Sequence, residues 1–102
     1  MNIIEVQKVA IAPNPHGIDV RKIYESEKIQ VAHITLKPGE QLKKHSTPVD
    51  VLFYVLQGTG VVEIGDEKKE VGKDSLIDSP AKIPHCWYNE GTETLTVLLL
   101  KL

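Results

Sequence analysis

The chain has 102 residues, of which 41% are hydrophobic and 25% are charged. This length and composition predict one globular domain, residues 1–102, with its own core, and they exclude a disordered chain. The formal net charge is −2, with acidic and basic residues interspersed, so the sequence has no basic stripe that would bind phosphates. We therefore expect no nucleic-acid partner.

The sequence contains no recognisable targeting or membrane-spanning segment. Residues 1–9 lack the basic start and long apolar run of a secretory signal, and the apolar runs elsewhere are much shorter than a membrane span. The single cysteine, Cys86, has no partner for an internal disulfide, which agrees with a reducing compartment. We expect a cytoplasmic protein with no membrane partner, and a packed thiol at Cys86.

The N-terminal third predicts short strands separated by turns. Segments 3–6 and 9–11 are short and apolar, and we expect residues 1–24 to form an arm of edge strands. The sequence PNPHG at 13–17 excludes regular structure there, which makes His16 a solvated turn residue. Further strands are expected at 20–24 and 29–36.

The central strand, residues 51–56, is apolar on both faces, with Val51, Phe53 and Val55 on one face. A strand with one wet face alternates apolar and polar residues, so this pattern predicts cover on both sides. One cover is the core of the domain, and the other is a second sheet or a second subunit. We predict a homodimer.

The remaining segments complete an all-β chain. Strands at 61–64 and 69–71 flank a hairpin turn at 65–68, another begins at Leu76, and residues 95–100 form the closing strand. No window sustains a helical period of 3.6 residues. Short strands at regular spacing predict a β-barrel or sandwich.

Two stretches resemble the motifs of the cupin superfamily. In the first, GEQLKKHSTPVDVLFYVLQG at 39–58, the residues Gly39, His45 and Gly58 match, whereas Thr47 stands at the position of the second histidine and Val51 at that of the glutamate. The resemblance covers roughly residues 31–100.

The second stretch, GKDSLIDSPAKIPHCWYN at 72–89, matches at Gly72, Pro80, His85 and Asn89. Lys82 replaces the inner glycine, and seven residues separate Gly72 from Pro80. The two motifs together imply a small single-domain cupin, a double-stranded β-helix of the jelly-roll type. In such a barrel the usual register places Leu36 inside and His33 outside, and an N-terminal strand often joins the sheet of a neighbouring subunit.

The resemblance also implies a site for a divalent metal. Cupins hold iron, manganese, zinc, nickel or copper through three histidines and a carboxylate. Of these positions the chain keeps His45 and His85, while Thr47 and Val51 have no suitable donor. A bulge that turned Asp50 or Asp78 inward would complete the shell, although exposure is the commoner fate of such residues. The alternative is a hydrogen-bonded pair of core histidines. We expect no organic cofactor.

Aromatic residues near the two histidines predict a ligand pocket. Trp87 shares a face with His85, and Phe53 shares one with Val51, because alternate residues of a strand face the same way. With Thr47, these side chains are candidates for the wall around a small organic ligand, and plain core packing is the alternative. The sequence thus predicts a barrel that binds or acts on a small molecule, with metal at the two histidines, or a metal-free dimeric barrel with a binding or structural role. It does not decide between enzyme and binding protein.

Overall fold

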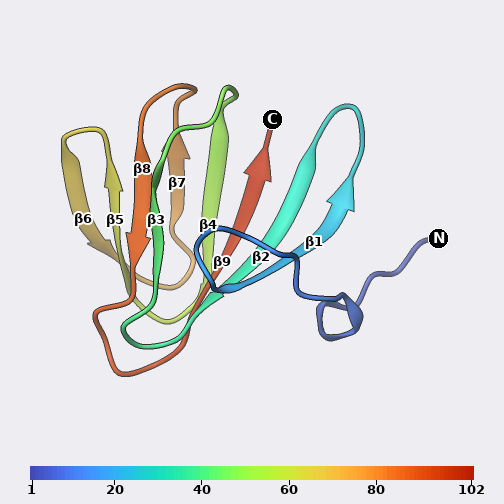
Figure 1. Cartoon of the computed structure of the whole chain (residues 1–102), viewed down its shortest axis with the longest axis horizontal. Coiled ribbons are helices and arrows are strands. Elements are labelled where there is room, and N and C mark those ends of the chain that lie inside the picture. The colour runs from blue at the N-terminus through green and yellow to red at the C-terminus, as the bar shows by residue number, and fades with distance from the viewer.

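The structure is a computed structural model that describes all 102 residues, and it contains nine β-strands, one short 3₁₀ helix and no α-helix (Figure 1). No helix is long and apolar enough to cross a membrane. The all-β prediction is confirmed. In chain order the elements are η1 (Val6–Lys8), β1 (Asp19–Glu25), β2 (Gln30–Leu36), β3 (Gln41–His45), β4 (Val51–Gln57), β5 (Gly60–Ile64), β6 (Glu67–Val71), β7 (Leu76–Ser79), β8 (His85–Tyr88) and β9 (Leu95–Lys101).

The strands form two antiparallel sheets. One sheet has the order β1-β2-β9-β4-β7, and the other has the order β3-β8-β5-β6. Neighbours such as β2 and β9 lie far apart in the sequence, so the chain crosses repeatedly between the sheets, as a jelly roll requires (Figure 1). The expected double-stranded β-helix is therefore the fold observed.

The core lies between the two sheets and follows the pleat of the strands. Val51, Phe53 and Val55 of β4 are fully buried, while the residues between them are half-buried. The smaller sheet adds side chains such as Leu42 and Trp87 to the same apolar cluster. Because alternate residues of a strand face the same way, the spacing of apolar residues sets which side of each strand packs inward.

The register of β2 agrees with the expected orientation. Ile34 and Leu36 are buried in the core, so His33 faces outward, where it pairs with Arg21 of β1 and Leu98 of β9. On the same outer face, Leu52 and Tyr54 of β4 are half-buried. The second sheet lies on the inner side, so it does not provide the second cover that the sequence indicates. The homodimer stays a prediction.

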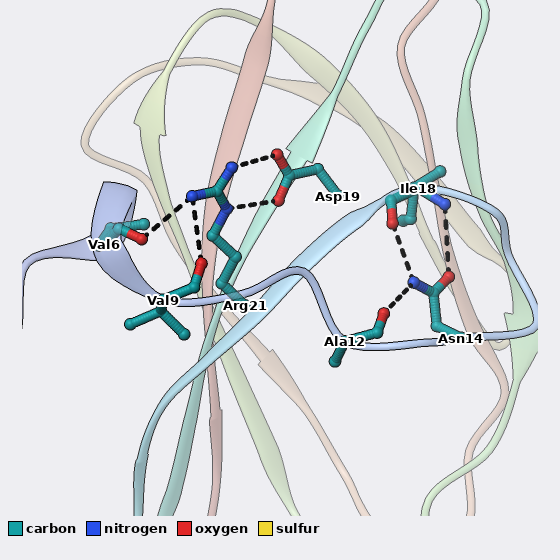
Figure 2. A network of polar contacts seen from close by, with 7 residues as sticks. All are labelled: Val6, Val9, Ala12, Asn14, Ile18, Asp19 and Arg21. Carbon is teal, nitrogen blue, oxygen red and sulfur yellow. Dashed lines mark hydrogen bonds and ion pairs between the residues drawn. The ribbon is translucent and has the colours of Figure 1, made fainter.

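The N-terminal segment differs from the sequence expectation. No strand precedes Asp19, and the expected strands at 3–6 and 9–11 are replaced by η1 and extended chain, because no strand of this chain pairs with them. Arg21 holds the segment instead: its Nη1 donates to the carbonyl oxygens of Val6 and Val9, both at 3.2 Å (Figure 2). Asp19 fixes the guanidinium through two hydrogen bonds of 3.0 and 3.2 Å.

The turn between β4 and β5 contains a glycine that cannot be replaced without backbone strain and steric overlap. Gly58 has a φ of +83°, and a Cβ built on it would lie 2.4 Å from the carbonyl oxygen of Thr94. Gly39 has a similar φ of +86°, but its Cβ would meet no atom within 4 Å. The two glycines thus share a left-handed backbone conformation and differ in the space available for a Cβ.

We expect Gly39→Ala to lower the free energy of unfolding by about 1–2 kcal/mol, the cost of a left-handed backbone with a Cβ. Gly58→Ala should lower it by about 1–3 kcal/mol more, because the new methyl group also displaces a backbone carbonyl. Urea unfolding followed by the fluorescence of Trp87 measures both losses. Equal losses would show that the contact with Thr94 does not constrain the turn.

Candidate functional site

The pairing of β3 with β8 brings the two motif histidines together inside the barrel. His45 is the register partner of His85, and their Nε2 atoms are 3.3 Å apart. The ring centroids are separated by 4.7 Å and the ring planes are nearly perpendicular. Two residues that are 40 positions apart in the sequence therefore form one polar pair inside the barrel.

Hydrogen bonds fix the proton positions of the neutral pair. Nδ1 of His45 lies 2.8 Å from the carbonyl oxygen of Lys43, which only accepts, so this nitrogen carries the proton. Nε2 of His45 is then an acceptor for the Nε2–H of His85. Nδ1 of His85 in turn accepts the hydroxyl proton of Ser79 at 2.8 Å. The pair is fully hydrogen-bonded without any further group.

His85 is neutral at physiological pH. Its side chain is completely buried, and the ring of Phe53 packs nearly perpendicular to it, with a centroid distance of 5.2 Å. Burial, followed by the charges of His45 and Lys101, lowers the pKa of His85 to about 4. Its tautomer therefore stays as the hydrogen bonds set it.

A third imidazole, His16, adjoins this pair, although we expected a solvated turn residue. Its Nδ1 accepts the backbone N–H of Lys43 at 2.9 Å, and its ring centroid is 5.1 Å from that of His45. The register between β3 and β8 shifts after Leu42, and at this irregularity the backbone of Lys43 bonds two imidazoles. His16 is half-buried, and burial, followed by the charges of His45 and Lys43, lowers its pKa.

Asn14 places His16 in this position. Its side-chain amide donates to the carbonyl oxygens of Ala12 and Ile18, at 3.0 and 2.9 Å (Figure 2). Its Oδ1 accepts the backbone N–H of His16 at 3.1 Å, which closes a tight turn. An asparagine two residues ahead of a histidine signals the turn in the sequence, but nothing local indicates the contact with Lys43.

A cavity of about 150 Å³ lies beside His16 and His45. Its walls come from β1, β2, β3, β9 and the 13–17 loop, and its apolar side chains include Val20, Val31, Ala32, Ile34, Leu42 and Leu99. The lining combines apolar side chains with two imidazoles, which suits a small organic molecule with one polar end.

The residues that we expected around a ligand occupy other places. Val51, Phe53 and Trp87 are buried in the core and do not line this cavity, because they fill the interior deeper between the sheets. Thr47 lies beyond the end of β3, and its hydroxyl donates to the carbonyl oxygen of Val49 at 3.1 Å. The structure therefore gives the cavity a different lining from the predicted one.

Neither candidate carboxylate completes a metal site. Asp50 is exposed, and its Oδ1 accepts the backbone N–H of Ala81 at 2.8 Å. Asp78 is exposed on the outer side of β7, opposite Leu52. Both carboxylates are thus exposed, which is the outcome that the sequence made the more common expectation.

The donor atoms present do not fit the full ligand set of a cupin metal. Two nitrogens bound tetrahedrally to zinc at about 2.0–2.1 Å lie about 3.3–3.4 Å apart, so the spacing of the His45 and His85 Nε2 atoms suits a pair of ligands. However, no group of three or more His, Cys, Asp or Glu side chains is arranged to hold a metal. His16 uses its Nδ1 lone pair on Lys43. Metal at His45 and His85 stays a prediction.

Two other motif positions have structural roles. Lys82, which stands where the resemblance expects glycine, has a φ of +68°, so the left-handed turn is kept at the cost of strain. Its backbone N–H donates to the carbonyl oxygen of Thr47 at 2.8 Å. Cys86 is buried, and its thiol donates to Tyr88 Oη at 3.2 Å, away from the histidine pair.

Comparison with known proteins places these observations in a family. Residues 32–101 match the family described as Cupin domain. The uncharacterized protein MJ1618 of Methanocaldococcus jannaschii is 35% identical over 78 residues, which cover 74% of this chain and 62% of that protein. The chain thus spans less than two thirds of the length of this relative.

Solved structures resemble the chain over nearly its whole length. TT1209 from Thermus thermophilus has a TM-score of 0.83 at 27% identity, covering 98% of this chain and 95% of its own. A protein described as a predicted oxalate decarboxylase from Thermotoga maritima has a TM-score of 0.86 at 17% identity, with 97% and 96% covered. The polyketide cyclase RemF from Streptomyces resistomycificus has a TM-score of 0.84 at 20% identity, with 99% and 78% covered. At the last two identities the likeness concerns the fold alone.

Proposed function

This chain belongs to the cupin family, and from that premise we propose that it binds a small organic molecule in the cavity beside His16 and His45. The observation that carries the proposal is the cavity itself, which combines an apolar wall with imidazoles held in defined orientations. The fold alone does not choose a function, because proteins of this fold differ widely in activity.

The imidazoles of His16 and His45 are pre-organised in the free protein. Both rings are hydrogen-bonded through Nδ1 to the backbone of Lys43, which fixes their orientation. A ligand that contacts them does not have to order flexible side chains, so little conformational entropy is lost on binding. The neutral His16 ring carries its proton on Nε2, which makes it a hydrogen-bond donor.

The apolar wall supplies the other part of the binding energy. Ile34 and Leu42 are buried members of the core cluster, and Val20 and Ala32 pack against it. These side chains stand on hydrogen-bonded strands of the two sheets. An apolar group placed against it leaves water at a gain of roughly 25 cal/mol per Å² of buried surface.

Filling the cavity tests this proposal. We expect benzoate, benzamide, benzyl alcohol and benzylamine, screened by ligand-observed NMR, to include at least one compound that binds the wild-type protein and loses at least tenfold in affinity to Ala32→Leu. Ala32 lines the cavity, and the larger side chain takes its space. Thr35→Leu, on the opposite face of β2, is the matched control and should bind as the wild type does.

If no compound binds, or if binding survives Ala32→Leu unchanged, the cavity is not a binding site. Thermal unfolding of both variants confirms that they are folded.

A metal-dependent activity is the second candidate, favoured by the 3.3 Å spacing of the two Nε2 atoms. A bound divalent ion would supply Lewis-acid chemistry to an organic substrate. Val51 lies opposite Ser79 in the sheet, and Ser79 bonds His85. The side chain at position 51 is therefore close to the pair, and the missing element is a carboxylate.

We expect Val51→Glu to destabilise the protein in EDTA, because it buries a charge, and to raise its affinity for Zn²⁺ at least tenfold over the wild type. Zn²⁺ should restore the thermal stability of the variant. Leu52→Glu, which faces the other way on β4, should show no gain in affinity. Isothermal titration with Zn²⁺ measures both.

No gain for Val51→Glu, or a gain that persists when His45→Ala is added, would show that position 51 does not complete a site with the histidines.

A further inference from the structure

Two lysines that lie outside both cupin-like motifs border the cavity. Lys22 of β1 and Lys101 of β9 both line it. Lys22 is the register partner of Ala32, and Lys101 pairs with Gln30, so each lysine stands on the inward-facing row of its strand. Glu25 is the one acidic residue of the lining. The charged groups of the cavity thus have an excess of one positive charge.

Lys101 lies close to the position from which the carboxylate has been lost. It is the direct partner of Val51 across β4 and β9. Its charge also acts on His85, whose pKa it lowers. In the cupin motif this position carries a glutamate that offsets the charge of a metal ion. In this chain Val51 occupies that position, and Lys101 is its neighbour across the strands.

His16 adds an N–H donor to the lining of the cavity. His16 accepts from Lys43 through Nδ1, so its Nε2 carries a proton and donates. This N–H donor favours a ligand with an acceptor group over a cation.

We propose that the ligand is a small organic carboxylate, with its carboxylate toward Lys101 and Lys22 and its apolar part against Ile34, Leu42 and Leu99. This inference rests on the proposed function and adds the chemical class of the ligand. Charge complementarity selects the anion, and the donors of the lining complete its hydrogen bonds. An apolar cavity of about 150 Å³ holds a benzene ring, so benzoate is a probe of suitable size.

The experiment compares three probes of one shape and different charge. We expect titration of the wild-type protein to show benzoate binding at least tenfold more tightly than benzamide, and benzylamine binding more weakly than either. Lys101→Met should weaken benzoate binding to the level of benzamide while leaving benzamide unchanged. Lys73→Met, an exposed lysine in the turn before β7, is the matched control and should keep the wild-type preference.

The outcomes separate the two proposals. If benzamide binds as tightly as benzoate, and both are lost in Ala32→Leu, the cavity binds small molecules but does not select carboxylates, and this inference is overturned. If benzoate still binds more tightly than benzamide in both Lys101→Met and Lys22→Met, the lysines do not recognise the carboxylate. That result also overturns this inference. If none of the probes binds, the proposed function fails as well. The comparison of probes on the wild-type protein stands even if a variant does not fold.

Discussion

The candidate site depends on the antiparallel pairing of β3 with β8. That pairing places His45 opposite His85 and joins their rings by a hydrogen bond inside the barrel. The irregularity after Leu42 then lets the backbone of Lys43 bond the Nδ1 atoms of His45 and His16. A side chain in an apolar interior needs its polar atoms satisfied, and here the main chain satisfies them. The orientation of the imidazoles is therefore a consequence of strand register.

The electrostatics of the interior have changed relative to the cupin motif. The motif supplies a carboxylate to balance a metal ion, whereas this chain has Val51 there and Lys101 beside it. A neutral His85 is compatible with these neighbours, because burial and nearby positive charge both lower its pKa. The proposal of an anionic ligand rests on this redistribution of charge.

The N-terminal segment contributes to the site although it contains no strand. Arg21 and Asp19 tie residues 6–9 to β1, and Asn14 shapes the turn that carries His16. Hydrogen bonds from polar side chains thus hold this segment in place, where strand pairing was expected to hold it. The segment closes one wall of the cavity, so its conformation affects what the cavity accepts.

The sequence by itself determined the all-β architecture, because short apolar segments recur between turn-forming residues and no window keeps the helical period of 3.6 residues. Its two degenerate motifs also identified the family and the His45–His85 pair. Only the tertiary structure decided that His16 joins this pair and that the cavity lies away from Phe53 and Trp87. These contacts join residues of different strands and loops, and their geometry depends on a local shift of register that residue periodicity does not encode.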